Sequence, residues 1–423
     1  MYVYQVKAGD TLREICRLFE VSEAEVIDIN DLLDPDVLAV GQALILPTLT
    51  HPYVVEPGET LGQIANRLGE SLSDLYADNP TLRSRALLAG ETIFVRSAPP
   101  RRGALEVNGY AYPFIDTGLL EKTLPYLTYL TIFSYGVSVA GELVPTEDEA
   151  LLAAAKNAGV APIMLLSTIG QDGTFNSEAA RVLLESETLQ TQLIEKLKTV
   201  LNEKGYYGID VDFEFIPVTL AAEYAAFITR LREALSPKTV MVALAPKYSA
   251  DQRGLLYEAH DYAALGKAAD RALIMTYEWG YTYGPPMAVA PKNEVRRVLQ
   301  YAVSAIPPEK ILMGFPNYAY DWPLPFERGV TKAKTLSNPE AAALAGREGA
   351  QILFDNRAAS PFFIYRGESG SHEVWFEDAR SVLAKLELLE EFRLKGMGVW
   401  NIMKPFSQLW YLLGYYYEIV KLL

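Results

Sequence analysis

From residue 105 to residue 400, short apolar runs alternate with amphipathic stretches of helical length, such as 177–204. This alternation is typical of βα units built around a parallel sheet, and eight such units close into a (β/α)8 TIM barrel. The runs that we expect to form its strands are 105–110, 129–135, 161–167, 208–215, 240–245, 271–277, 311–316 and 396–400. Segment 318–376 between the last two runs is too long for a loop, so we expect a small α+β insertion with a strand at 362–365.

The first hundred residues contain an internal repeat without gaps. Tyr4 aligns with Tyr53 and Gly41 with Gly90, at a constant offset of 49 residues. Each copy contains a short alternating run, a Gly-Asp/Glu-Thr turn, two helical stretches and a closing apolar run. The repeat therefore predicts two βααβ modules. We expect the boundaries to be 1–48 and 49–97 for the modules, 98–104 for a linker and 105–423 for the barrel.

The charge of the chain excludes several classes of partner. The 423 residues include 38 Lys and Arg against 53 Asp and Glu, a formal net charge of −15. Repulsion from phosphates makes nucleic acid and anionic membrane surfaces poor partners. The one cysteine, Cys16, has no partner for an intramolecular disulfide or a structural zinc site. No run approaches roughly 18 apolar residues and the start shows no signal-peptide pattern, so we expect a soluble protein made in the cytoplasm, without membrane insertion. We also expect a monomer.

The run 208–215 carries three carboxylates at alternate positions, Asp210, Asp212 and Glu214. Strand periodicity places them on one face, and in a barrel strand that face points to the interior because the apolar face packs under the helices. Burial and mutual repulsion raise the pKa of at least one of them, as general acid catalysis near neutral pH requires. Glu214, nearest the mouth of the barrel, is the expected acid. A solvated strand face and a divalent metal site are the alternatives.

Residues 207–214 resemble the Asp-x-x-Asp-x-Asp-x-Glu signature of family 18 glycoside hydrolases, with Tyr207 in place of the first Asp. Further matches at predicted strand ends are Ser167 to Gly170, with Gln171 in place of a Gly, Met275 to Glu278, with Glu in place of Asp, Gly314 to Tyr318, and Trp400. Strand ends are where barrel enzymes place their active sites. The resemblance extends from about residue 105 to the C-terminus and implies a glycosidase.

This resemblance implies a retaining, substrate-assisted mechanism, in which the N-acetyl carbonyl of the substrate attacks the anomeric carbon. Glu214 is then expected to protonate the glycosidic oxygen, Asp212 to orient the acetamide and Asp210 to tune Asp212. Tyr277 is expected to donate to the acetamide oxygen and Trp400 to form the floor under the sugar, with ordinary aromatic packing as the alternative for both. Further expected substrate-binding residues are Glu278, Asn317 and Tyr318. The resemblance implies neither a metal nor a cofactor.

The two modules resemble LysM, a module that binds glycans containing N-acetylglucosamine. The Tyr-x-Val-x-x-Gly-Asp/Glu-Thr-Leu opening, a central Asn and a closing Gly are all present twice. The resemblance implies a sugar groove between the opening turn and the loop after the Asn. The implied binding residues are Gly9, Asp10, Thr11 and Asn30 in the first module and Gly58, Glu59, Thr60 and Asn79 in the second. A duplicated spacer without a ligand is the alternative, because Gly and Thr also serve turn geometry and helix capping.

The order of the parts resembles that of the spore cortex-lytic N-acetylglucosaminidases of spore-forming bacteria. That resemblance implies cleavage of the β-1,4 bond after N-acetylglucosamine in cortex peptidoglycan, and a location in the spore cortex or coat. A protein of this net charge must then hold an anionic glycan by stacking and hydrogen bonds. The alternatives are a chitinase or chitooligosaccharidase and a non-catalytic glycan-binding spore protein, and the presence of Glu214 argues against the latter.

Overall fold

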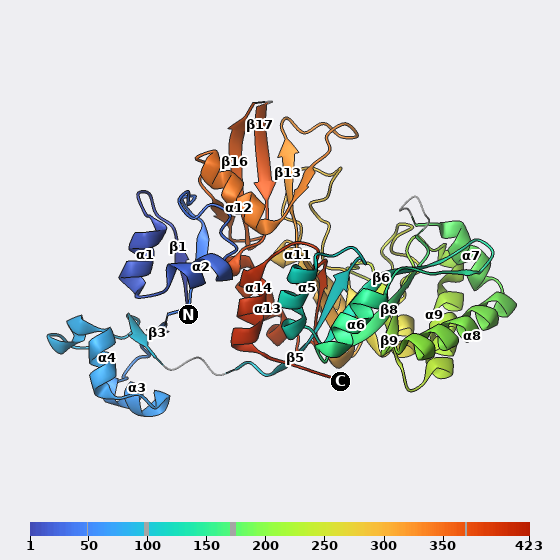
Figure 1. The fold of residues 1–423 in the computed structure, drawn as a ribbon, viewed down its shortest axis with the longest axis horizontal. Coiled ribbons are helices and arrows are strands. Elements are labelled where there is room, and N and C mark those ends of the chain that lie inside the picture. The colour runs from blue at the N-terminus through green and yellow to red at the C-terminus, as the bar shows by residue number, and fades with distance from the viewer. Residues whose placement is uncertain (49, 97–100, 170–174, 369) are drawn as a thin grey trace.

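The computed structural model describes residues 1–48, 50–96, 101–169, 175–368 and 370–423. Eight parallel strands form a closed barrel, because the first of them pairs with both the second and the last. In chain order, which is also their order around the barrel, they are β5 (Ala104–Ala111), β6 (Tyr129–Val137), β8 (Ala161–Ser167), β9 (Gly208–Asp212), β10 (Thr239–Leu244), β11 (Arg271–Ile274), β12 (Ile311–Pro316) and β18 (Gly396–Trp400). The expected TIM barrel is confirmed (Figure 1).

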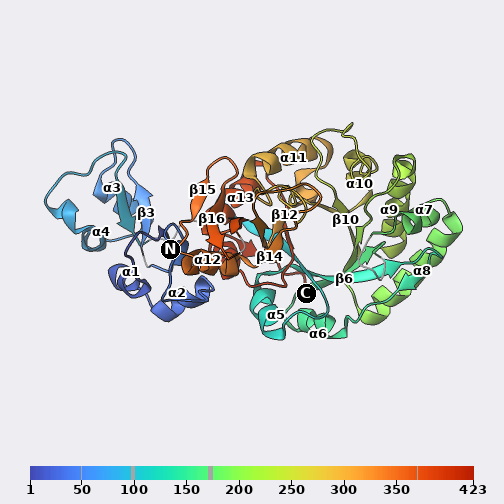
Figure 2. The same ribbon diagram turned by 90° about the horizontal axis from the view of Figure 1, so that it is seen from above.

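Helices surround the barrel, as Figure 2 shows. They are α5 (Thr117–Thr123), α6 (Glu149–Asn157), α7 (Ser177–Leu184), α8 (Glu187–Lys204), α9 (Ala221–Leu235), α10 (Tyr262–Ala268), α11 (Lys292–Ala305), α13 (Ala379–Glu391) and α14 (Ser407–Tyr416), with 3-10 turns at Leu124–Tyr126, Val218–Leu220 and Pro308–Lys310 and edge strands β7 (Leu143–Val144) and β19 (Glu418–Ile419). The prediction of a single helix over 177–204 is wrong, because two helices, α7 and α8, cover this range. The Ser186 side chain accepts a hydrogen bond from the Leu189 N–H and so caps the start of α8. In the described ranges no helix is long and apolar enough to cross a membrane.

Three barrel strands end earlier than the sequence predicts, and β10 is one residue short, at Leu244 rather than at Ala245. β9 ends at Asp212 rather than at Phe215, and β11 ends at Ile274 rather than at Tyr277. In the segments that follow these two strands, Phe215 and Glu278 take positive φ, at +56° and +69°, a backbone conformation that does not belong to a strand. The chain therefore leaves the sheet just before the residues that are expected to meet the substrate.

The apolar face of β9 packs outward, under the helices. Ile209 and Val211 are fully buried in the main apolar core. Just beyond the strand, Phe213 stacks on Tyr224 and Phe227 of α9, with ring centroids at 5.9 and 6.0 Å. These contacts fix the orientation of the strand, so that the alternating carboxylates are turned toward the interior.

The insertion between β12 and β18 contains a five-stranded antiparallel sheet and one helix. In the order of the sheet, its strands are β14 (Lys334–Leu336), β13 (Ala319–Pro323), β17 (Gly370–Trp375), β16 (Ser360–Gly367) and β15 (Leu353–Asp355), and its helix is α12 (Asn338–Arg347). The strand expected at 362–365 lies within β16. The insertion rises from the barrel at the top of Figure 1.

The N-terminal modules have the expected βααβ order. The first contains β1 (Tyr2–Gln5), α1 (Leu12–Phe19), α2 (Glu23–Ile29) and β2 (Ala43–Leu46), and the second contains β3 (His51–Val54), α3 (Leu61–Leu68), α4 (Leu72–Asp78), a 3-10 turn at Pro80–Arg83 and β4 (Thr92–Val95). In each module the two strands pair antiparallel. Figure 1 shows the first module beside the insertion and the second farther from the barrel.

A buried ion pair holds the junction at which the insertion returns to the barrel. Glu377 follows β17 and Lys385 lies in α13, and both side chains are almost fully buried. Their Oε2 and Nζ atoms are 2.6 Å apart. Removal of one member of such a pair leaves the other charge in the interior without a partner, which destabilises a fold more than the intact pair stabilises it.

We expect Lys385→Met to lower the free energy of unfolding by about 3–5 kcal/mol, because the Glu377 carboxylate remains buried without a cation. Urea unfolding followed by circular dichroism measures this change. The control combines Lys385→Met with Glu377→Leu, which removes both charges and is expected to recover most of the loss. Equal losses in the single and the double variant would contradict the interpretation.

Candidate active site

Asp210 and Asp212 occupy the end of β9 inside the barrel and have few polar partners. Asp210 is fully buried, and its Oδ2 accepts a hydrogen bond of 2.6 Å from the hydroxyl of Tyr110 in β5. The Oδ1 atoms of both aspartates are buried without a hydrogen-bond partner among the described residues. Such burial disfavours the charged form of a carboxyl. Within the described ranges, no three His, Cys, Asp or Glu side chains are grouped so that they could hold a metal ion.

Burial raises the pKa of all three carboxyls in this row. The pKa of Asp210 rises to about 6, although the hydrogen bond from Tyr110 acts in the opposite direction. The pKa of Glu214 rises to about 7. For Asp212, burial and then the charges of Glu214 and Asp210 raise the pKa well above its ordinary value. The row therefore retains protons near neutral pH, which general acid catalysis requires.

A buried histidine, which the sequence analysis did not identify, holds the segment that carries Glu214. The Ala245 N–H donates to Nδ1 of His260 at 2.8 Å, so the neutral ring carries its proton on Nε2. Nε2 lies 3.0 Å from the carbonyl oxygen of Phe213 and donates to it. Burial lowers the pKa of His260 to about 4, which keeps the ring neutral. No sequence pattern points to this histidine, because its partners are backbone groups of two other segments.

Glu214 lines an open cleft with an empty volume of about 630 Å³. Its other lining residues follow β10 and β11: Pro246, Tyr248, Gln252, Leu256, Tyr257, Met275, Tyr277, Glu278 and Trp279. The indole Nε1 of Trp279 donates to the Tyr248 hydroxyl at 2.8 Å, and this hydroxyl donates to Glu294 at 2.9 Å. A cleft with aromatic walls and a few fixed polar groups suits a small organic ligand such as a sugar. Tyr248, Gln252 and Trp279 were not among the expected site residues. Because active sites of barrels lie just after strand ends, their positions after β10 and β11 could have indicated them.

Three of the expected residues, Tyr277, Glu278 and Tyr318, lie together where the insertion meets the cleft. Tyr277 is nearly buried and lines the cleft with Glu278. The Glu278 carboxylate accepts hydrogen bonds from the hydroxyls of Tyr318 and Tyr320, the latter at 3.2 Å. Burial raises the pKa of Glu278. Tyr320, which lies in β13, therefore brings the insertion into contact with the cleft.

Trp400 and Asn317 occupy different surroundings. Trp400 packs edge-on against Tyr110 and Phe133, with ring centroids at 5.8 and 5.1 Å, and remains partly exposed at the end of β18. Asn317 is fully buried, and its Nδ2 donates to the carbonyl oxygens of Asn401 and Lys404 at 3.0 and 2.8 Å. The Asn317 amide is therefore engaged in holding the loop that follows Trp400.

Tyr207 and Gln171 both differ from the family motifs, and of these two residues the structure describes the surroundings of Tyr207 alone. Tyr207 packs near Tyr129, with ring centroids at 6.3 Å, in a small apolar cluster at the start of β9. The first motif position therefore lies at the opposite end of the strand from Glu214, within a packed layer. In the third-strand motif, Gly170 and Gln171 lie outside the described residues, and the Ser167 hydroxyl bonds that of Ser134 at 3.2 Å.

In the first module, the expected glycan-binding residues make hydrogen bonds within the module. Nδ2 of Asn30 donates to the carbonyl oxygens of Val26 and Ile45 at 2.7 and 2.9 Å, and the Ile45 N–H donates to its Oδ1 at 2.6 Å. The Asp10 carboxylate accepts the Tyr4 hydroxyl at 2.7 Å. Thr11 caps α1, and the turn is completed by Gly9 at φ +87°.

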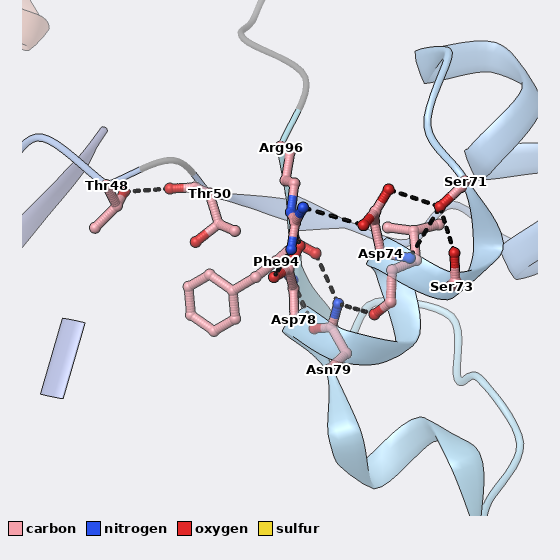
Figure 3. A network of polar contacts seen from close by, with 10 residues as sticks. Thr48, Thr50, Ser71, Ser73, Asp74, Asp78, Asn79, Phe94 and Arg96 are labelled. Atoms are coloured by element: carbon pink, nitrogen blue, oxygen red, sulfur yellow. Dashed lines mark hydrogen bonds and ion pairs between the residues drawn. The ribbon is translucent and has the colours of Figure 1, made fainter. Parts of the chain in front are cut away.

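The second module repeats these bonds. In Figure 3, Asn79 joins α4 to β4: Nδ2 donates to the carbonyl oxygens of Leu75 and Phe94 at 2.9 and 2.7 Å. The carboxylate of Glu59 accepts the Tyr53 hydroxyl at 2.6 Å. Thr60 caps α3, and Gly58 takes φ +86°. All eight expected residues thus stabilise the βααβ fold, and the turns at 9–11 and 58–60 remain largely exposed.

Comparison with known proteins agrees with this architecture. The model of glycosyl hydrolases family 18 matches residues 124–404, and the LysM domain model matches residues 4–47 and 53–96. The cortical fragment-lytic enzyme of Bacillus subtilis is 35% identical over 430 residues, covering 100% of this chain and 99% of that protein. The crystal structure of the Bacillus megaterium spore cortex-lytic enzyme SleL is 36% identical with a TM-score of 0.89, covering 100% and 99% of the two chains.

A further relative also matches the chain along its whole length. The putative sporulation-specific glycosylase YdhD of Bacillus subtilis is 30% identical and covers 100% of both chains. Since the family model spans most of the barrel and the carboxylate row ends at a cleft, the match includes the part of the fold that carries the chemistry. The chain belongs to glycosyl hydrolases family 18, and it is a glycosidase with two LysM domains at its N-terminal end.

Proposed function

We propose that the chain hydrolyses the β-1,4 bond that follows N-acetylglucosamine in spore cortex peptidoglycan. Two relatives matched along their whole length, named as cortical fragment-lytic and spore cortex-lytic enzymes, support this substrate. The observation that carries the proposal is the position of Glu214, which lines the cleft and has its pKa raised to about 7 by burial. A protonated carboxyl in a cleft is the general acid that a glycosidic oxygen needs.

In the proposed reaction, Glu214 donates its proton to the glycosidic oxygen while the acetamide oxygen of the same sugar attacks the anomeric carbon. The bond to the leaving sugar breaks and an oxazolinium ring forms; water then opens that ring with Glu214 as base, so the configuration is retained. Asp212 orients the acetamide N–H, and its partnerless Oδ1 supports this role. Asp210, bound to Tyr110, tunes Asp212, and Tyr277 donates to the acetamide oxygen.

The substrate is held by rings and hydrogen bonds rather than by net charge, since the chain carries −15. Trp400 is the proposed floor under the sugar, and Glu278 and Tyr318 are the proposed polar contacts; Asn317 supports the loop beside them. The LysM domains anchor the enzyme to the glycan. We further propose that the protein works as a monomer in the spore, where its substrate lies.

We expect Glu214→Gln to lower the rate of hydrolysis by at least about a hundredfold, because the amide donates no proton to the leaving oxygen. Release of reducing ends from cortex fragments measures the rate, and a sedimentation assay tests whether glycan binding is retained. Glu223→Gln, on the exposed face of α9, is the matched control and is expected to keep full activity. Full activity of Glu214→Gln would overturn the assignment.

The raised pKa of Glu214 also predicts a pH-dependent effect on stability. Because the pKa of Glu214 is about 7 in the folded chain against an ordinary value of 4.5, the fold loses stability as pH rises from about 4.5 to about 7, and the full loss is present above pH 7. Glu214→Gln is therefore expected to raise the free energy of unfolding by up to about 3 kcal/mol near pH 8 and to change little near pH 4. Urea unfolding at the two pH values measures this; an equal gain at both would contradict the cause.

Digestion of two substrates separates the proposed enzyme from a chitooligosaccharidase. Both substrates present the same acetamido sugar, so the catalytic row alone does not distinguish them. We expect cortex fragments to be cleaved with at least about tenfold higher kcat/KM than chitooligosaccharides. Mass spectrometry of the products identifies the bond that is broken. Cleavage of chitooligosaccharides alone would refute the cortex substrate and leave the glycosidase assignment intact.

A further inference from the structure

The two LysM domains use the same loop in different ways. We call residues 31–41, after Asn30, the first loop, and the equivalent residues 80–90, after Asn79, the second loop. The first loop contacts the catalytic barrel. The N–H and hydroxyl of Ser407, at the start of α14, donate to the carboxylate of Asp31 at 2.5 and 2.8 Å. Gln408 follows in α14, and its Nε2 donates to Asn30 Oδ1 at 2.8 Å.

The first loop also packs into the insertion. Ala39 belongs to the apolar core that is built around α12 and includes Ile352 and Phe376. The Ile352 N–H donates to the carbonyl oxygen of Val40 at 2.8 Å. Gly41 lies so close to the backbone that a Cβ on it would be 2.0 Å from the Ile352 carbonyl oxygen. The first loop is therefore an internal contact surface of the molecule.

Among the described residues, the second loop lacks such contacts. Leu88 occupies the position of Ala39, yet it is 60% exposed, whereas Ala39 is 3% exposed. Gly90 occupies the position of Gly41 with a similar φ, +79° against +87°, but a Cβ on Gly90 would meet nothing within 4 Å. Figure 2 shows the second module on the far side of the first, away from the barrel. The second loop therefore remains open to a ligand.

The loops also differ in charge. The first loop carries three aspartates and no Lys or Arg, whereas the second loop carries two arginines and no Asp or Glu. Arg83 and Arg85 stand at the positions of Asp34 and Asp36, and both residues are exposed. Arg85 pairs with Glu91, the residue after the loop, at 2.7 Å, and the Arg83 guanidinium lies 5.6 Å from the centroid of the Tyr76 ring. The stem peptides of peptidoglycan carry free carboxylates, whereas the lactyl carboxyl of a substituted sugar is used in the amide bond to its peptide. Arginine binds carboxylates through paired hydrogen bonds, and a row of aspartates repels them.

We propose that the two LysM domains have different roles: the first loop docks its module onto the barrel and insertion, and the second loop binds the acidic glycan. This division rests on the proposed peptidoglycan substrate. The first module then acts as a fixed part of the catalytic unit. The second module, whose loop is exposed and carries the two arginines, anchors the enzyme.

The test compares two charge reversals at equivalent positions in the full chain, each combined with Glu214→Gln to prevent digestion. Arg83→Asp with Arg85→Asp is expected to weaken binding to insoluble peptidoglycan about tenfold. Asp34→Arg with Asp36→Arg is expected to weaken it less than about twofold. The dissociation constants come from depletion assays, and circular dichroism verifies that each variant is folded. On chitin, which lacks carboxylates, the arginine reversal should have a smaller effect.

Binding to the two glycans shows whether the peptidoglycan substrate or only the division of roles between the modules is wrong. If the parent chain binds chitin but not peptidoglycan, the peptidoglycan substrate fails, and the division of roles fails with it. If the parent chain binds peptidoglycan and the aspartate reversal weakens binding as much as the arginine reversal, only the division of roles is overturned.

A matched glycine pair tests the docking. Gly41→Ala and Gly90→Ala introduce the same methyl group at positions with similar φ, but only Gly41 faces the Ile352 carbonyl. Hydrogen exchange at the Ile352 amide, which is bonded to Val40, is expected to rise at least about tenfold in Gly41→Ala and to stay unchanged in Gly90→Ala. Protection that persists in Gly41→Ala would overturn the docking role.

Discussion

The site depends on the desolvation of carboxyl groups inside a closed barrel. Asp210 and Asp212 each leave a buried oxygen without a described partner, and burial raises the pKa of both and of Glu214. The same burial that keeps Glu214 protonated near neutral pH destabilises the fold when the carboxyls ionise. Burial of these carboxyls therefore favours acid catalysis but lowers the stability of the fold, and the packing of the surrounding barrel compensates for this loss.

Several parts of the fold serve to hold this row in place. Phe213 fills the layer between barrel and helices, and His260 binds its carbonyl oxygen, so the chain turns out of the sheet with Glu214 at the cleft. Tyr320 of the insertion bonds Glu278 on the other side of that cleft. The buried Lys385–Glu377 pair fixes the return of the insertion. The insertion is thereby coupled both to the cleft and to the helical layer.

The two LysM modules have the same local fold but different surroundings. Both copies use the same Asn bridge, the same capped helices and the same glycine turns. Among the described residues, only the loop of the first copy contacts both the barrel and the insertion, and Ala39 and Gly41 are small enough to pack closely against the insertion. In the second copy, Leu88 at the position of Ala39 stays in solvent. Contacts outside the repeat therefore decide how each copy is used.

Local periodicity in the chain was enough to predict the barrel, the repeat and the common orientation of Asp210 and Asp212, with Glu214 next in the same row. Three expected strands, 161–167, 311–316 and 396–400, match β8, β12 and β18 in both bounds. Three-dimensional contacts were needed to show where β9 and β11 end, that His260 binds the carbonyl oxygen of Phe213, that Asn317 holds a loop and that one module is docked. These features depend on hydrogen bonds and packing between distant segments, which leave no periodic trace in the chain.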